Sequence, residues 1–386
     1  MACKGHGNDL NTRKDKQEMK KNKKLLIGIG VVILLGIATI GIFIQDVFRE
    51  DRFGKPVKNI TIGLLLAQTG FGSDFGQSEK TIIPLLKEIY GENVRFVLED
   101  SKSDAAKGVL AARKMLDIDN VDMIYCDLTS VASAISPLMK KSRKVLMAAV
   151  YLDSLIKDNP FAIRNIPNAE DESRLLLKFF GMRHKSGKIL LIGSDDEFGR
   201  GAVSATKSLL AEFGLVFAGM DFIPEDLSLV SSLAEKIIQS SSDGVYVGSL
   251  SPSMGILVKE LRGRGYTGDI ITTDAFAYDY IFNLAGEAAK SVVYVDFPRT
   301  DAFQEVIQKV EGGNVTPAAI LMYDGIRMYL DKIVAEYSIN SDVKINELTC
   351  QINGIFGDTR LIHQEMKYPL VIVNAGVRPS PRSRVL

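Results

Sequence analysis

Polar side chains stand directly after two apolar segments of the chain, at positions where binding chemistry is expected. Thr129 and Ser130 follow the apolar segment 121–125 and open a stretch with helical spacing. Hydroxyl groups and free backbone N–H groups at a helix start can bind a carboxylate, and the same residues can also serve as plain helix caps. Asp274 follows the segment 270–272, where its carboxylate can receive an ammonium group or cap a turn. The residue pattern alone leaves both alternatives open.

The residue patterns of known catalytic sites are missing from the sequence. It contains no GxSxG, HExxH or GxxxxGK[ST] motif, and His6, His184 and His363 lie away from the strand-end loops. The segment Gly199–Ser204 resembles a GxGxxG loop but lacks the third glycine and begins well after the preceding strand. We therefore predict a binding protein, not an enzyme, with no cofactor and no metal.

The three cysteines, Cys3, Cys126 and Cys350, form no CxxC motif, so they indicate neither a zinc site nor a disulfide framework. Whether Cys126 and Cys350 pair stays open, and two buried free thiols are the favoured interpretation.

The elements that must position these residues follow a strand–helix alternation. Strands are predicted at 60–66, 94–98, 121–125 and 145–150, separated by helices at 78–90, 104–116 and 130–141. A second series has helices at 171–182, 201–213, 228–239 and 253–264, and strands at 188–192, 215–220, 244–247 and 270–272. Helices at 301–310 and 317–337 and a strand at 368–374 complete the chain.

This alternation indicates parallel sheets that are covered on both faces. Two series of similar size predict an α/β fold with two doubly wound parallel-sheet lobes. In each lobe the ligand end lies at the carboxyl ends of the strands, so we expect an interlobe cleft that binds a small molecule.

The N-terminal region has the properties of a membrane anchor. Leu25–Ile44 is a run of 20 residues without a charge, long enough for one transmembrane helix. The basic tail 1–24 precedes it, and a charged linker, 45–56, follows. The positive-inside rule predicts a cytoplasmic N-terminus and an extracytoplasmic body. No small-x-small cleavage site follows the run, which favours an uncleaved signal anchor over a cleaved signal peptide.

Charge is unevenly distributed although the formal net charge is zero. Residues 1–24 carry eight basic and three acidic residues, which leaves the remainder of the chain mildly acidic. A mildly acidic body argues against nucleic acid as a partner, because binding phosphates requires a surplus of Lys and Arg.

The order of these segments resembles one protein family. The stretches TIGLLLAQTGFGSDFGQ, VDMIYCDLTSVASAISPLM and ILLIGSDDEFGRGAVSATKSLLAEFG are similar to type I periplasmic binding proteins, in their leucine/isoleucine/valine-binding branch. The resemblance covers roughly residues 57–380. It implies two lobes that are joined by three crossovers, near 164–167, 296–300 and 353–358, and that close on a ligand by a hinge motion. The N-lobe would comprise 57–165 and 298–352, and the C-lobe 166–297 and 353–386.

The resemblance also implies roles for particular residues. Thr129 and Ser130 match a hydroxyl pair that binds the ligand carboxylate, and Asp274 matches an acidic residue that binds its ammonium group. Three further positions would line the pocket: Phe75, Phe198 and Leu250.

Some residues depart from the family pattern. The usually Ser/Thr-rich loop after 145–150 contains Tyr151, Asp153 and Ser154, and Asp153 would repel a carboxylate unless Ser154 takes its place. Phe198 stands where a tyrosine is usual and lacks its hydroxyl group. An uncharged or cationic solute therefore stays open beside an amino acid.

Two functions are expected from this combination. The first is an extracytoplasmic receptor for an amino-acid-like solute in an ABC-type importer, with a permease as its partner. The alternative is a membrane-tethered sensing ectodomain with a sensor kinase as its partner, which the uncleaved anchor favours slightly. Permease and ATPase genes nearby would indicate the importer, and a kinase gene would indicate the sensor.

Overall fold

The computed structural model describes residues 59–151, 153–224, 226–310, 315–335 and 345–377, all of which belong to one compact unit. The predicted tail, transmembrane segment and linker, residues 1–56, lie outside the described residues. Among the described residues, no helix is both long enough and apolar enough to cross a membrane.

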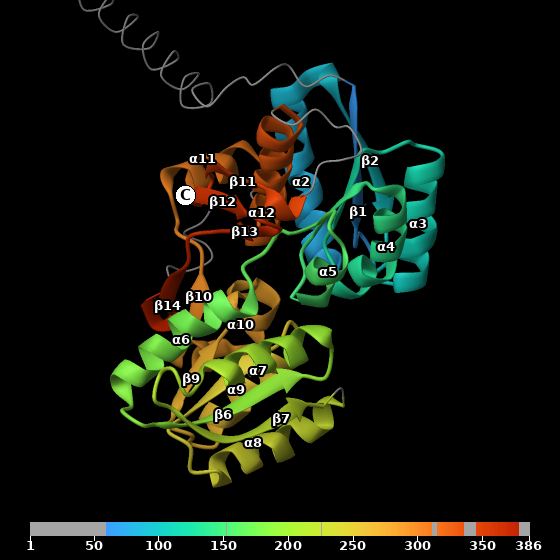
Figure 1. Ribbon diagram of the computed structural model, residues 1–386. Coiled ribbons are helices and arrows are strands. Elements are labelled where there is room, and N and C mark those ends of the chain that lie inside the picture. The colour runs from blue at the N-terminus through green and yellow to red at the C-terminus, as the bar shows by residue number, and fades with distance from the viewer. Residues whose placement is uncertain (1–58, 152, 225, 311–314, 336–344, 378–386) are drawn as a thin grey trace, which may run out of the picture. The chain divides into compact units, whose positions relative to one another are not determined.

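The N-lobe is built on a sheet whose strands run in the order β11-β12-β13-β5-β4-β3-β1-β2 (Figure 1). Neighbouring strands from β5 to β2 are parallel, whereas β11, β12 and β13 pair antiparallel. The strands are β1 (Ile60–Leu66), β2 (Val94–Asp100), β3 (Met123–Cys126), β4 (Val145–Ala148), β5 (Ala162–Arg164), β11 (Thr349–Gly354), β12 (Gly357–Ile362) and β13 (Glu365–Lys367).

Helices cover both faces of this sheet. One core cluster joins the sheet to α2, α11 and α12, and another joins it to α3 and α4. The helices are α2 (Ser73–Tyr90), α3 (Ala105–Asp117), α4 (Thr129–Ser142), α5 (Asp153–Asp158), α11 (Asp301–Lys309) and α12 (Pro317–Met328), which continues as a π-helical turn, Tyr329–Val334.

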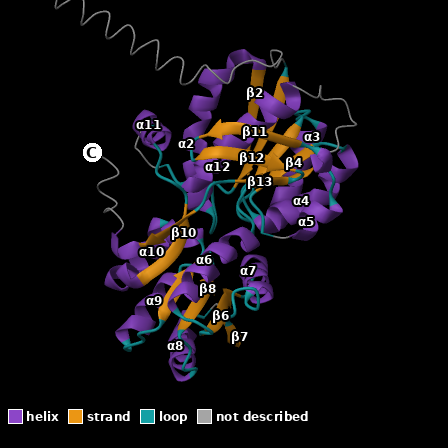
Figure 2. Ribbon diagram, turned by 60° about the vertical axis from the view of Figure 1, so that its left-hand side comes forward, coloured by secondary structure: helices purple, strands orange, loops and turns teal. Residues whose placement is uncertain are grey.

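The C-lobe repeats this architecture with the strand order β14-β10-β9-β8-β6-β7, in which β14 alone is antiparallel (Figure 2). Core clusters place α8, α9 and α10 on one face and α6 and α7 on the other. The strands are β6 (Lys188–Ser194), β7 (Val216–Ile223), β8 (Gly244–Gly248), β9 (Asp269–Thr272), β10 (Val292–Asp296) and β14 (Val371–Asn374). The helices are α6 (Ala169–Arg183), α7 (Glu197–Leu209), α8 (Val230–Gln239), α9 (Ser253–Gly263) and α10 (Asp279–Ala285).

Local side-chain caps explain where several helices begin. The side chains of Asp104, Asn168, Asp196 and Thr300 each accept a hydrogen bond from the backbone N–H three residues later. These bonds satisfy donors that have no partner within the helix.

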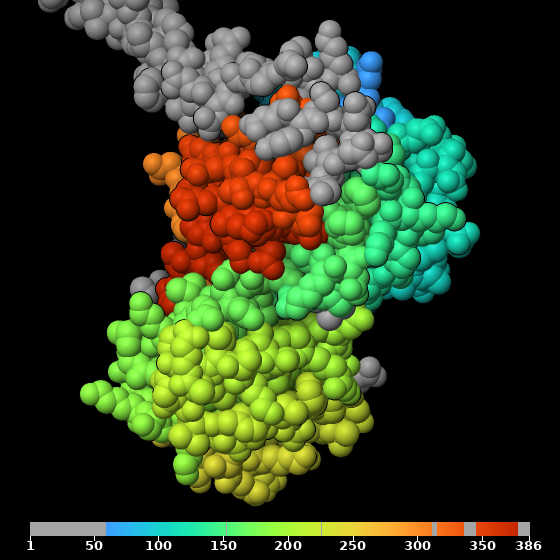
Figure 3. Space-filling view, viewed as in Figure 1, coloured from blue at the N-terminus to red at the C-terminus, as the bar shows by residue number. Residues whose placement is uncertain are grey.

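The chain passes between the two sheets three times. The first passage lies between β5 and α6, the second between β10 and α11, and the third between β13 and β14. The third passage differs from the predicted 353–358, which instead lies within the antiparallel pair β11–β12. Figure 3 shows the orange-red part of the chain, which contains β11–β13, in the same upper body as the blue and teal N-terminal part. The C-terminal part of the N-lobe therefore extends to Lys367, which corrects the predicted boundary at 352.

The sequence pattern missed β11–β13 because these strands are rich in polar residues, whereas the predicted strands were continuous apolar runs. The helix predicted at 317–337 is described to 335, but its α-helical part ends at Met328 and a π-helical turn follows.

Gly76 allows α2 to pack on the backbone at the end of β1. A Cβ atom at this position would lie 2.3 Å from the carbonyl oxygen of Ala67. We expect Gly76→Ala to lower the free energy of unfolding by about 1–3 kcal/mol, since backbone atoms must move to accommodate it. The measurement is urea denaturation of the full-length chain.

Gly263→Ala is the matched control. Gly263 is the exposed last residue of α9, and an added Cβ would meet nothing within 4 Å. Its substitution should leave stability unchanged or raise it slightly. Equal losses in the two variants would contradict the packing argument.

Candidate functional site

The strand orders place the candidate site at the carboxyl ends of the parallel strands. In each sheet the first strand lies between two later ones, β1 between β2 and β3, and β6 between β7 and β8. A crevice forms where the strand order reverses. In the N-lobe this point is occupied by Asp127, whose Oδ2 accepts a hydrogen bond of 2.7 Å from the backbone N–H of Ala67.

Aromatic side chains from the two lobes meet at this edge. Phe75, in the first turn of α2, packs edge-on against Tyr278, which follows β9, with ring centroids 4.8 Å apart. Tyr280 stacks on Tyr278 at 6.1 Å, and its hydroxyl donates a hydrogen bond of 2.6 Å to the carbonyl of Leu250. Leu250 packs against core clusters of both lobes. These contacts form an apolar wall that both lobes share.

A second interlobe contact centres on Tyr151, from the loop after β4. Its ring lies 4.2 Å from that of Phe198 in α7. The Tyr151 hydroxyl donates a hydrogen bond to Glu172 Oε1 in α6, and Glu172 Oε2 accepts one of 3.1 Å from the backbone N–H of Asp274. This chain of hydrogen bonds connects the N-lobe to the end of β9 in the C-lobe.

The two carboxyl groups in this series of hydrogen bonds, those of Glu172 and Asp274, are held close together without a cation. Burial raises the pKa of Asp274 to about 7, with repulsion from Asp296 as the second cause. Burial, followed by repulsion from Asp274, raises the pKa of Glu172 well above its ordinary value. Among the described ion pairs, Asp296 is bound by Arg299 at 2.7 Å, whereas Glu172 and Asp274 pair with no basic side chain. A cation beside these two carboxyl groups would favour their ionised form.

A further pair of acids lies on the N-lobe side. Glu79 is fully buried in α2, and its Oε1 accepts a hydrogen bond of 2.7 Å from the hydroxyl of Tyr125. Burial, and then the neighbouring charge of Asp127, raises the pKa of Glu79 well above its ordinary value. Burial raises the pKa of Asp127 to about 7. No N–H or O–H group of another described residue donates to Glu79 Oε2 or Asp127 Oδ1, and the two carboxyl groups are within hydrogen-bonding reach of each other.

The structure brings five of the predicted residues into connected contacts: Phe75, Tyr151, Phe198, Leu250 and Asp274. Thr129 begins α4, and its hydroxyl lies 3.5 Å from the carbonyl oxygen of Ala149. Ser130 and Ser154 are exposed, and no described hydrogen bond joins either side chain to the others.

From its position in the sequence, Asp153 was expected to repel a ligand carboxylate, but the structure gives it a different role. Its carboxylate forms an ion pair of 2.5 Å with the buried guanidinium of Arg164 and lies 3.9 Å from Lys157. The charge of Asp153 is thus compensated within the N-lobe.

Five residues at this edge were not identified from the sequence: Glu79, Asp127, Glu172, Tyr278 and Tyr280. Glu172 stands among three acids in the first turn of α6, a pattern that the helix dipole alone explains. Glu79 belongs to an ordinary amphipathic helix. The available signal was that Glu79 follows Phe75 by four residues, a spacing that puts both side chains on one face of α2.

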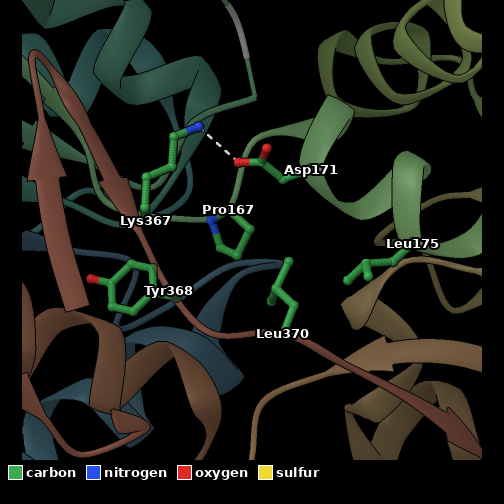
Figure 4. A pocket seen from close by; sticks show the side chains of 6 residues that line it. All are labelled: Pro167, Asp171, Leu175, Lys367, Tyr368 and Leu370. Carbon is green, nitrogen blue, oxygen red and sulfur yellow. Dashed lines mark hydrogen bonds and ion pairs between the residues drawn. The ribbon is translucent and has the colours of Figure 1, made fainter. Parts of the chain in front are cut away.

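A separate pocket of about 350 Å³ lies where the chain passes between the sheets (Figure 4). Lys367 closes one side of it through an ion pair of 2.7 Å with Asp171. Its lining residues are Pro167, Asp171, Leu175, Lys367, Tyr368 and Leu370, none of which belongs to the interlobe edge described above.

Comparisons with known proteins agree with this architecture. Residues 59–342 match the model of the periplasmic binding protein family. The chain belongs to this family, in its leucine/isoleucine/valine-binding branch.

Three similar proteins illustrate the relationship. A Leu/Ile/Val-binding protein homologue of Brucella abortus is 23% identical over 291 residues, covering 70% of this chain and 76% of that protein. A solute-binding protein from R. palustris in complex with 4-hydroxybenzoate has a TM-score of 0.72 at 18% identity, covering 83% of this chain and 94% of that one. A branched-chain amino acid substrate-binding protein of Streptococcus pneumoniae, bound to isoleucine, has a TM-score of 0.70 at 18% identity, covering 83% and 97%.

The R. palustris and Streptococcus pneumoniae proteins are substrate-binding proteins of transporters. Because the chain belongs to a family of binding proteins, it is a solute-binding protein and not an enzyme. These relatives give no support to the alternative of a sensing ectodomain.

The raised pKa values make the stability of the ligand-free protein depend on pH. The folded state holds protons that the unfolded chain releases, so stability should fall as pH rises from about 4, the ordinary carboxyl value, toward the folded value. For Asp274 that value is about 7.

We expect Asp274→Asn to flatten this fall in stability, measured as the thermal midpoint between these pH values. Glu92→Gln, an exposed carboxyl in the same chain, should keep the wild-type slope. An unchanged slope in Asp274→Asn would contradict the assignment.

Proposed function

We propose that the chain is the extracytoplasmic receptor of an ABC-type importer and that its lobes close on a small solute that carries an amino group. The observation that carries this proposal is the position of Asp274. Its carboxyl group stands at the end of β9, beside Glu172, with no basic partner among the described ion pairs, and next to Tyr151 of the other lobe.

The chemistry of these groups favours an ammonium ion over a bare carboxylate. A cation placed between Asp274 and Glu172 would allow both carboxyl groups to ionise, since an opposite charge lowers a raised pKa. Aromatic faces attract the same group through cation–π interactions. The buried hydroxyl of Thr273, which has no hydrogen-bond partner among the described residues, supplies a further polar contact beside Asp274.

The proposed binding residues follow from this arrangement. Asp274 receives the ammonium group, and the apolar part of the solute packs on the aromatic wall. Thr129, Ser130 and Ser154 are proposed to contact the polar end of the solute. The walls are formed by Phe75, Tyr151, Phe198 and Leu250.

We further propose that Leu25–Ile44 tethers the receptor to the membrane with the N-terminus in the cytoplasm. The support is the uncharged length of this segment and the basic cluster before it. The full-length chain should stay in the membrane pellet after an alkaline carbonate wash, whereas a chain that begins at Gly54 should be released. Release of the full-length chain by the wash would contradict the tether.

A thermal-shift screen of the full-length chain in mild detergent tests the binding function. A bound solute at about 100 times its dissociation constant should stabilise the protein by about 2.7 kcal/mol. Amino acids, amines and small aromatic acids are the compounds to compare. No shift with any compound would count against a solute receptor.

The same screen with Asp274→Ala tests the role of this residue. The variant should lose the shift that amino-group-bearing solutes produce, since the ammonium group then loses its counter-charge. Glu92→Ala, an exposed substitution, should keep the shift. An undiminished shift in Asp274→Ala would show that Asp274 only caps the turn after β9.

A further inference from the structure

The buried acids Glu79 and Asp127 form a second pair of carboxyl groups, on the N-lobe side, without a counter-charge among the described ion pairs. They come from different elements, α2 and the end of β3, and they meet at the point where the strand order of the N-lobe sheet reverses. Each carboxyl group has one oxygen with a described donor, from Tyr125 or Ala67, and one without. Leaving such oxygens buried and without a donor is unfavourable.

Charged groups around this pair do not neutralise it. No described ion pair includes Glu79 or Asp127. Four neighbouring groups interact electrostatically with the pair, and none of them is a cation. They are Asp100 of β2, Tyr125 and Cys126 of β3, and Tyr278 of the C-lobe. A proton held between the two carboxyl groups can satisfy them only while no other cation is present.

The pair stands close to the wall that the two lobes share. Glu79 follows Phe75 by one helical turn on the same face of α2, and Phe75 contacts Tyr278 of the C-lobe. Burial raises the pKa of Tyr278, and the charges of Asp274 and Glu79 raise it further. The Tyr278 hydroxyl group is therefore within electrostatic reach of acids from both lobes.

The surroundings of the pair suit an organic cation. Among the described residues, no group of three or more His, Cys, Asp and Glu side chains is placed to hold a metal. Aromatic rings near both acid pairs suit an ammonium group on an alkyl chain, since they cover the methylenes and attract the charge.

We propose that the solute carries two amino groups, one bound by Asp274 and Glu172 and the other by Glu79 and Asp127, with its alkyl chain against Phe75 and Tyr278. This inference rests on the proposed receptor function and specifies the class of its ligand as a diamine. The second ammonium group replaces the proton between Glu79 and Asp127, so binding releases protons to the solvent.

Titration calorimetry of the full-length chain in mild detergent tests this inference. The probes are the diamines putrescine and cadaverine, the matched monoamines butylamine and pentylamine, L-leucine, and 4-hydroxybenzoate. We expect each diamine to bind more tightly than its monoamine. We also expect the heat of diamine binding near neutral pH to vary with the ionisation enthalpy of the buffer, which reports proton release.

Glu79→Gln should weaken diamine binding by roughly 30-fold or more, because one partner of a buried charge pair is removed. It should leave monoamine binding unchanged. Asp127→Asn, which keeps an oxygen for the Ala67 N–H, is the second variant, and Glu92→Gln is the exposed control. The thermal midpoint of each variant verifies folding.

The outcomes distinguish a failure of the diamine proposal from a failure of the proposed receptor function. Binding of leucine or 4-hydroxybenzoate without diamine binding would leave the receptor function intact and overturn the diamine. Equal affinity for diamines and monoamines, or equal losses for both in Glu79→Gln, would also overturn it. Failure of all the probes would count against both the diamine and the receptor function.

Discussion

The reversal of strand order in each parallel sheet is the constraint on which the rest of this structure depends. Because β1 lies between β2 and β3, the helices that follow β1 and β3 leave on opposite faces and a crevice remains between them. The residue after β3 must fall in this crevice. That residue is Asp127, and the N–H of Ala67 at the end of β1 fixes one of its oxygens. The same geometry in the C-lobe brings Leu250 and Asp274 to the corresponding edge.

Acids at this edge differ from acids elsewhere in the chain. Asp269, at the start of β9, is bound by Arg183 and His184, and although burial raises its pKa, hydrogen bonds from these two residues outweigh it and lower the pKa below the ordinary value. Glu172 and Asp274 have no such partner among the described ion pairs. The fold thus pairs the half-buried acid at one end of β9 and leaves the acids at the other end without a counter-charge. These carboxyl groups remain available to a ligand, at the expense of stability near neutral pH.

The segments that pass between the sheets are bound to one another. Asn165 donates a hydrogen bond of 2.9 Å to the carbonyl of Leu321 and accepts one of 2.9 Å from the hydroxyl of Tyr368. Lys367 forms ion pairs with Asp171 and with Glu365. The first and third passages therefore form one connected unit that sets how the lobes join, while Tyr151 and Glu172 connect the lobes at the ligand edge.

The sequence by itself determined the strand–helix alternation, the two-lobed α/β class and the candidate roles of Thr129 and Asp274. These depend on local properties, namely apolar runs of strand length, helical spacing and cap residues. The charge-free segment 25–44 is likewise a property of composition. The strands β11 and β12 were not predicted because they are rich in polar residues, and the third passage was placed too early as a result.

Only the tertiary structure decided which of these side chains meet and which acids stay without a counter-charge. Glu79 and Asp127 are ordinary residues of a helix and a loop until the fold brings them together, and Asp153 is compensated by Arg164 only because β5 lies beside β4. Burial and the presence or absence of a partner depend on groups distant in the chain. For that reason the candidate binding positions could be proposed from the sequence, whereas the proposal that the ligand carries positive charge rests on the structure.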